Sequence, residues 1–260
     1  MSPITTHLYK IQAYKGESFF RIYDDWLALI VAAFAKEEAD YMKVMERYGP
    51  REAGKDHPAD HFAKAMGELM LQCQTASAKD KTFPDFLGQI YEEESITNKY
   101  KSQFFTPEPM CQMMAALTMK DLPKQAISVH DPACGSGRCL IAAMPYLPLK
   151  DANYYGTDLD LTCVHMTTIN MLLRNVDAFI IHGNTLSLEV YGGYATRYTV
   201  MGGEVRKLSP ELARSLLVRS VEAIAKKQET VIGTPEKVQQ VQEAAQDFVA
   251  NKRGQFDMGF

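Results

Sequence analysis

The segment at residues 131–137 constrains this chain most, because it has the pattern of a sharp turn between a strand and a helix. Its sequence is Asp-Pro-Ala-Cys-Gly-Ser-Gly, and it follows a short β-type run at residues 127–130. The glycines at 135 and 137 let the backbone turn tightly and approach a ligand, and the helix that follows presents free N–H groups at its start. A turn that binds nothing has the same pattern, so this segment alone leaves both interpretations open.

A carboxylate further along the chain makes the pattern more specific. A second β-type run ends at Asp158, 21 residues after Gly137, which is close to the roughly 20-residue spacing of acids that hold ribose hydroxyls. The turn lacks both the Gly-x-Gly-x-x-Gly of dinucleotide enzymes and the Gly-Lys-Ser/Thr of phosphate loops. The pair therefore predicts a pocket for a nucleoside without phosphates, which S-adenosylmethionine fits.

The surrounding sequence predicts an α/β fold of the Rossmann-like type. Three short β-type runs alternate with two helical stretches, which indicates a parallel sheet with right-handed crossovers. The strands are expected at residues 127–130, 153–156 and 178–182, and the helices at 138–147 and 161–174. Helical spacing also covers residues 17–95, an extended hairpin is expected from Tyr191 to residues 202–203, and a helix begins at 209. We expect an N-terminal helical domain (1–100), a cofactor-binding core (101–203), a helical extension (204–253) and a tail (254–260).

Composition excludes several classes of protein. The longest apolar run, residues 26–35, is shorter than the roughly 20 residues of a membrane span, and the N-terminus lacks the pattern of a secretion signal. Five scattered cysteines indicate free thiols and a cytoplasmic protein. His57 and His61 have no obvious third ligand, so an exposed turn is expected there and no metal. A net charge of −4 gives no general attraction for DNA, which would need a local patch or a partner.

Four motifs in order resemble an enzyme family. Residues 85–92, the Gln-Phe-Phe-Thr-Pro at 103–107, the glycine turn and the Gly-Thr-Asp at 156–158 resemble the modification subunits of type I restriction systems and other adenine-specific DNA methyltransferases. The resemblance covers residues 85 to about 190 and implies the S-adenosylmethionine-dependent methyltransferase fold. It implies the following cofactor contacts: Phe105 and Thr106 beside the methionine part, Asp131, Ala133, Gly135 and Gly137 as the cradle, Asp158 at the ribose and Asn184 at the adenine amino group. Asn184 stands where the family usually has aspartate.

The chain departs from the family where methyl transfer takes place. Transfer to an adenine amine needs a flipped base, an acceptor for the amine and an aromatic face, which the family supplies through Asn-Pro-Pro-Tyr or Phe. No such segment occurs in the 260 residues, so the catalytic residues stay unassigned. Tyr194 and Arg197 are candidate nucleic-acid contacts, and they are equally compatible with an ordinary strand surface.

The C-terminal residues carry a separate pattern. Gln255, Met258 and Phe260 resemble the short peptides by which bacterial DNA-processing proteins bind the replication sliding clamp, with the two apolar side chains in its pocket. Stray hydrophobic residues at a frayed terminus have the same appearance.

Three functions remain open. The first is a DNA-adenine methyltransferase-like protein of phage, plasmid or bacterial origin that binds S-adenosylmethionine and DNA. It either uses a specificity subunit or a second methyltransferase chain, or acts with little sequence preference. The second is an inactive relative that binds DNA or protein, for example in anti-restriction. The third is a methyltransferase for protein or RNA, which the missing Pro-Pro-aromatic motif also disfavours.

Overall fold

A computed structural model describes residues 2–80, 83–97, 105–119, 127–147 and 152–232 of the chain. The chain divides into two compact units, residues 1–216 and residues 217–260. The first unit contains the N-terminal helices and the sheet. The domain boundaries expected at residues 100/101 and 203/204 stay a prediction.

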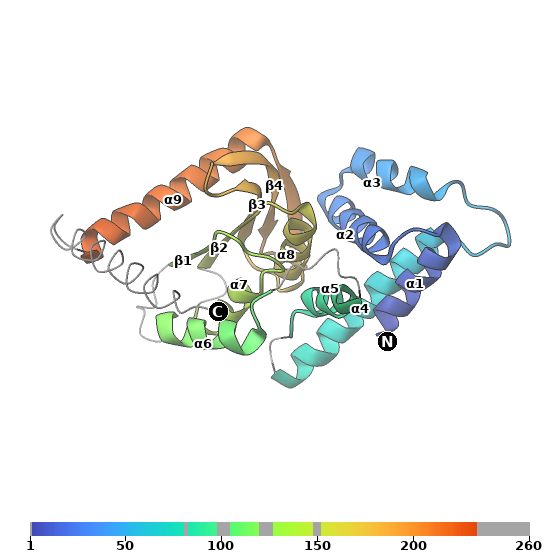
Figure 1. Cartoon of the computed structure of the whole chain (residues 1–260), viewed down its shortest axis with the longest axis horizontal. Coiled ribbons are helices and arrows are strands. Elements are labelled where there is room, and N and C mark those ends of the chain that lie inside the picture. Colours follow the sequence, from blue (N-terminus) through green and yellow to red (C-terminus); the bar gives the residue numbers. More distant parts are fainter. Residues whose placement is uncertain (1, 81–82, 98–104, 120–126, 148–151, 233–260) are drawn as a thin grey trace, which may run out of the picture. The chain divides into compact units, whose positions relative to one another are not determined.

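The first unit is built on a five-stranded mixed sheet in the order β1-β2-β3-β4-β5 (Figure 1). The first three strands are parallel and the last two are antiparallel additions. The strands are β1 (Ile127–Asp131), β2 (Ala152–Asp158), β3 (Ala178–Asn184), β4 (Glu189–Arg197) and β5 (Glu204–Leu208). Helices α7 (Arg138–Ala143) and α8 (Leu161–Leu173) connect the parallel strands. The predicted α/β core with helical crossovers is therefore confirmed.

The remaining helices lie before and after the sheet in the sequence. They are α1 (Pro3–Lys15), α2 (Phe19–Ala35), α3 (Glu38–Met45), α4 (Pro58–Asp80), α5 (Phe86–Thr97), α6 (Glu108–Met119) and α9 (Pro210–Ile232). Short 3-10 turns occur at Glu46–Tyr48 and Met144–Tyr146. Helix α1 begins earlier than the predicted helical region because Ser2 caps it, Pro3 fits its first turn, and Ile4 and Leu8 are buried on one face.

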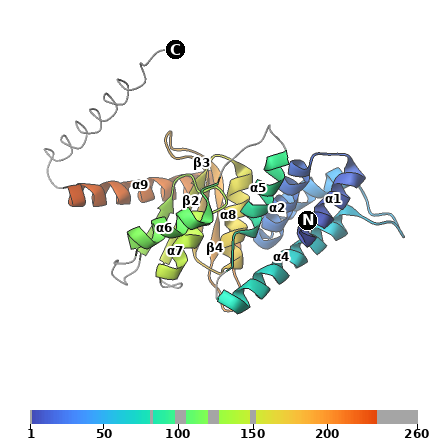
Figure 2. The same ribbon diagram turned by 60° about the horizontal axis from the view of Figure 1, so that its bottom comes forward.

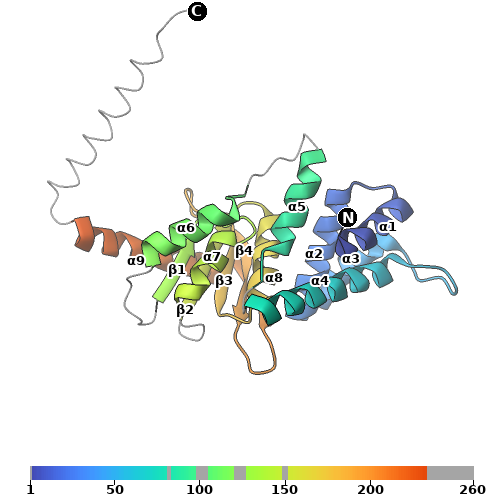
Figure 3. The same cartoon turned by 90° about the horizontal axis from the view of Figure 1, so that it is seen from below.

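Helix α8 joins the helical region to the sheet. Every residue from Thr162 to Leu172 is buried, as expected for a helix enclosed on all sides. Its Met166 and Ile169 belong to the core of the helical region, whereas its Val164 and Met171 belong to the core against the sheet. In two further views α8 lies between the strands and the N-terminal helices (Figures 2 and 3). The helical region and the sheet therefore share their packing.

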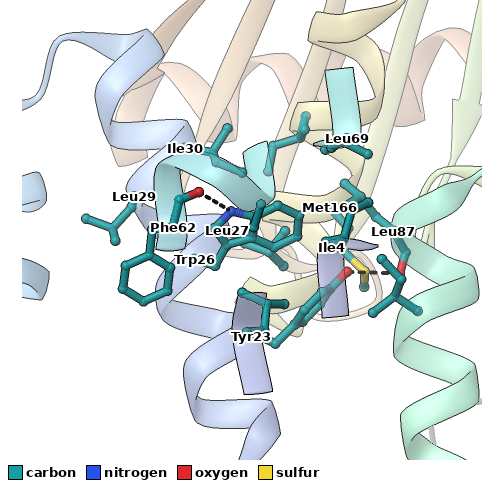
Figure 4. Packing of buried hydrophobic residues seen from close by; sticks show 14 of the residues in the cluster. Ile4, Tyr23, Trp26, Leu27, Leu29, Ile30, Phe62, Leu69, Leu87 and Met166 are labelled. Carbon is teal, nitrogen blue, oxygen red and sulfur yellow. Dashed lines mark hydrogen bonds between the residues drawn. The ribbon is translucent and has the colours of Figure 1, made fainter. Parts of the chain in front are cut away.

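The centre of the helical core is formed by aromatic side chains of α2 (Figure 4). Trp26 and Tyr23 are both 0% exposed. The indole N–H of Trp26 donates to the carbonyl of Phe62 at 3.2 Å, and the Tyr23 hydroxyl donates to the carbonyl of Leu87 at 2.9 Å. Both buried polar groups thus have hydrogen-bond partners. Without partners they would lower the stability of the fold. Helix α5 is tied to α2 through the second of these bonds.

The hairpin after β3 is longer than the sequence predicted. Strand β5 continues to Leu208, five residues past Gly203, because it pairs with β4 and both Val205 and Leu208 are buried, at 4% and 7% exposed. The residues expected to begin the helical extension are therefore strand, and α9 starts at Pro210. A register shift between His182 and Gly183 also interrupts the pairing of β3 with β4.

His57 and His61 differ from their expected exposed turn, since both are 5% exposed. His57 accepts the Ala59 N–H at 3.1 Å, next to the start of α4, and His61 Nε2 lies 2.6 Å from the Asp56 carboxylate.

The described residues contain no group of three or more His, Cys, Asp or Glu side chains that could hold a metal ion. None of the helices in this part of the chain has the length and apolar character that a membrane-spanning segment needs.

Candidate cofactor site

The glycine turn lies at the carboxyl ends of β1 and β2 and is held by hydrogen bonds to both. The Cys134 N–H donates to the carbonyl of Thr157 at 3.0 Å. The Gly135 N–H donates to the Asp158 carboxylate at 2.8 Å, and the Asp131 carboxylate accepts the Ala133 N–H at 3.2 Å. Binding sites of parallel α/β sheets form at this edge. The turn and the two strand-end acids are thus one connected structure.

Both glycines of the turn have backbone conformations that disfavour a side chain. Gly135 has φ +55°, and an added Cβ would lie 2.8 Å from the Phe105 ring. Gly137 has φ +85°, and its Cβ would lie 3.0 Å from the Thr167 side chain. Left-handed φ values and close neighbours both favour glycine. The Phe105 ring therefore lies directly against the backbone of Gly135.

A cavity of about 410 Å³ opens at this turn. It is lined by residues that the sequence had predicted as cofactor contacts, namely Phe105, Thr106, Asp131, Ala133, Gly135 and Asp158. It is also lined by residues that had not been predicted, namely Met114, Cys134, Ser136, Arg138 and Cys139. Elements far apart in the sequence thus meet around one space.

The charges of this cavity suit a ligand that carries positive charge. Among its described lining residues the charged side chains are Asp131, Asp158 and Arg138. Burial, and then the neighbouring carboxylate of Asp158, raise the pKa of Asp131. Burial also raises the pKa of the Cys134 and Cys139 thiols, which keeps them uncharged at neutral pH. Two carboxylates would repel a diphosphate, whereas they attract a sulfonium or ammonium group and accept hydrogen bonds from ribose hydroxyls.

Two predicted cofactor residues lie outside this lining. Gly137 serves as the N-cap of α7. Asn184 ends β3, and its amide oxygen accepts the N–H groups of Leu186 at 2.9 Å and Ser187 at 3.3 Å. The oxygen expected to receive an adenine amine is therefore engaged within its own turn. Contact of Asn184 with a cofactor stays a prediction.

Tyr194 and Arg197 do not form one surface. They are three residues apart on β4, so their side chains project from opposite faces of the strand. The Tyr194 hydroxyl lies 3.3 Å from Nε2 of His165, and burial raises the pKa of Tyr194 to about 12. Arg197 is exposed. A nucleic-acid role stays a prediction for each residue separately. The tail residues Gln255, Met258 and Phe260, like Gln103 and Phe104, lie outside the described residues.

Arg138 is the lining residue that sequence reasoning missed most clearly. It is 6% exposed, and it begins α7 directly after Gly137. A cation is unfavourable at the positive end of a helix. An arginine at this position therefore indicates a specific acidic partner, and this could have been read from the sequence. Burial opposes its charge, but the Glu92 and Asp85 carboxylates outweigh that effect and raise the pKa of Arg138.

Together with the fold, this site defines an α/β domain with an acid-lined pocket at the carboxyl ends of its parallel strands. The model of the N-6 DNA Methylase family matches residues 82–201, which include β1 to β4 and the cavity. This part of the chain is thus similar to the N-6 DNA methylase family.

Individual relatives agree with that assignment. The methylase subunit of the type I restriction enzyme MpnII of Mycoplasma pneumoniae is 31% identical over 111 residues, which cover 40% of this chain and 20% of that protein. The methylase subunit of the type I restriction enzyme MjaIX of Methanocaldococcus jannaschii is 26% identical, with 39% and 19% covered. The chain therefore spans about a fifth of the length of these curated relatives.

Two solved structures are similar to parts of this chain, with low TM-scores. A type I restriction-modification methyltransferase subunit from Streptococcus thermophilus is 26% identical with a TM-score of 0.32, covering 46% of this chain and 26% of that chain. A class I S-adenosylmethionine-dependent methyltransferase from Listeria monocytogenes is 17% identical with a TM-score of 0.33, covering 69% and 53%. With TM-scores this low, the assignment of the fold rests on the strand order of this chain itself.

Proposed function

We propose that residues 82–201 bind S-adenosylmethionine and form the cofactor-binding part of an adenine-N6 DNA methyltransferase. The observation that supports this most is the convergence of Thr106, the glycine turn and Asp158 on one cavity. Asp158 is suited to the ribose hydroxyls, and together with Asp131 it suits the positive sulfur of the cofactor. When bound, the cofactor supplies an electrophilic methyl group next to a positive sulfur.

Positioning of the adenine amine and choice of the DNA site are expected to need residues outside this chain. The 260 residues contain no Asn-Pro-Pro-aromatic segment, and the chain spans about a fifth of its type I relatives. We therefore expect protein residues outside these 260, for example those of a second polypeptide, to position the adenine amine and to select the DNA site. The second candidate function is a regulatory protein that binds the cofactor without transferring its methyl group, and the same missing segment supports it.

A methyl-transfer assay tests this proposal. The chain is incubated with unmethylated DNA and tritium-labelled S-adenosylmethionine, alone and with the products of neighbouring reading frames. We expect background incorporation for the chain alone and incorporation above background with a partner, which Asp131→Ala removes because that carboxylate lines the cavity. Incorporation by the chain alone would contradict the need for a partner. Cofactor binding without transfer under every condition would favour the regulatory function.

A further inference from the structure

A buried polar cluster connects α5 with the glycine turn, and it is centred on Asp85. This carboxylate is 1% exposed and accepts four donors. They are the Gly88 N–H at 2.9 Å, the Asn170 amide at 2.8 Å, the Ser136 hydroxyl at 2.5 Å and Nε of Arg138 at 3.2 Å. A carboxylate has about four acceptor sites. Asp85 is therefore saturated, and two of its partners belong to the segment that forms the cofactor cavity.

Gly88 allows α5 to approach this segment closely. A Cβ at Gly88 would lie 2.0 Å from an oxygen of Asp85 and 2.7 Å from the Ser136 hydroxyl. Real Cβ atoms do not come this close to other atoms, so any side chain here would push α5 away from the turn. Asp85 and Gly88 thus act together in seating α5 against Ser136.

Arg138 extends the cluster to the other wall of the cavity. Its guanidinium donates to both Glu92 oxygens at 3.3 and 2.9 Å and to the carbonyl of Thr106 at 3.1 Å. It also lies 5.8 Å from the centre of the Phe105 ring, which itself packs on Gly135. One side chain therefore links α5 with the Phe105–Thr106 wall and begins the helix that leaves the turn.

Burying such a cluster costs free energy of hydration, so it contributes little net stability to the fold. Buried ion pairs give up hydration, and well-packed apolar residues of similar volume often stabilise a protein equally or better. Their advantage lies in fixing one arrangement, because each charge tolerates few alternative partners. Here the fixed arrangement is that of the cavity walls relative to α5. Helix α5 in turn belongs to the helical core, in which Leu87 and Ile90 are buried.

We propose that Asp85 and Arg138 are positioning residues that couple the cofactor cavity to α5 and, through α5, to the N-terminal helical core. The cluster holds the turn at Ser136 and the carbonyl of Thr106 in the arrangement that accepts the cofactor. Because coupling between two sites is reciprocal, cofactor binding stabilises α5 in return. This inference rests on the proposed function, since it requires that S-adenosylmethionine binds.

Calorimetry with S-adenosylmethionine, together with hydrogen exchange, tests the coupling in the full chain. Asp85→Asn replaces an acceptor oxygen by a donor and should lower the affinity by about tenfold or more, within the usual range of coupling between sites. Glu92→Gln, which removes the negative charge and one of the two oxygens that accept from Arg138 at a site that is 34% exposed, is a milder variant that should fold and should lower the affinity by about threefold or more. In the wild type the cofactor should slow exchange of the α5 amides, and in Asp85→Asn this protection should be lost.

Asp25→Asn is the matched control. Asp25 is also a buried carboxylate, 5% exposed, which accepts the Tyr48 hydroxyl at 2.7 Å and a nitrogen of Arg47 at 3.2 Å. Its loss should lower Tm and leave the affinity for the cofactor within about twofold. Wild-type affinity in Asp85→Asn or Glu92→Gln, or an equal loss in Asp25→Asn, would overturn the coupling alone. No binding by the wild type would instead overturn the proposed function, and with it the coupling.

Discussion

A Gly135→Val variant is expected to bind S-adenosylmethionine about 100-fold more weakly than the wild type while keeping its fold. Gly135 has φ +55°, which costs roughly 1–2 kcal/mol for a residue with a side chain. The new Cβ would also meet the Phe105 ring at 2.8 Å, and overpacking of this kind costs about 1–3 kcal/mol. The turn or the ring must therefore move into or away from the cavity. Calorimetry gives the affinity, and far-UV circular dichroism checks the fold.

Gly16→Val separates backbone strain from damage to the site. Gly16 has a similar φ of +70°, but an added Cβ would meet nothing within 4 Å. This variant should lose about 1–2 kcal/mol of stability and retain cofactor affinity. If the two variants had the same affinity, the cavity beside Gly135 would not be where the cofactor binds.

A Trp26→Ala variant should lower the free energy of unfolding by about 3–5 kcal/mol, as expected for truncation of a fully buried aromatic residue. Trp26 is 0% exposed, and its indole bonds to the carbonyl of Phe62 across the helical core. Because α2 packs against α8, the helical region and the sheet should lose stability together. Urea unfolding followed by far-UV circular dichroism measures the change, since the only tryptophan is removed.

Phe34→Ala provides the comparison on the same helix. Phe34 is 38% exposed, so its truncation removes less buried surface than that of Trp26 and should cost about 1–2 kcal/mol. Equal losses in the two variants, or a sheet that unfolds at wild-type urea concentration after loss of Trp26, would show that α2 and the sheet do not share one core.

The parallel strands and the glycine turn could be predicted from the sequence because their signals are local. Asp131 and Asp158 each follow a short β-type run, and the two glycines lie between a strand and a helix. Their meeting then follows from the geometry of a parallel sheet, in which carboxyl ends share one edge. Helix α1 was missed even though Ser2 and Pro3 are a standard helix start.

The polar cluster around Asp85 could not be predicted in the same way. Its partners Ser136, Arg138 and Asn170 are 51, 53 and 85 residues away in the chain, and no periodicity relates them. Strand β5 was missed for a similar reason, because its five residues are too few for a clear alternating pattern. The orientation of Tyr194 likewise depends on the register of β4, which is shifted beside His182.

Binding of S-adenosylmethionine to the purified chain tests the central claim most directly. Isothermal titration calorimetry should detect binding by the wild type, and Asp158→Ala should remove it. That carboxylate lines the cavity and also accepts the Gly135 N–H, so its loss affects both the ribose site and the turn. Asp60→Ala, at a partly exposed carboxylate paired with Arg51, should bind as the wild type does. No heat of binding by the wild type at high micromolar cofactor, or equal binding by Asp158→Ala, would contradict the assignment of this cavity to S-adenosylmethionine.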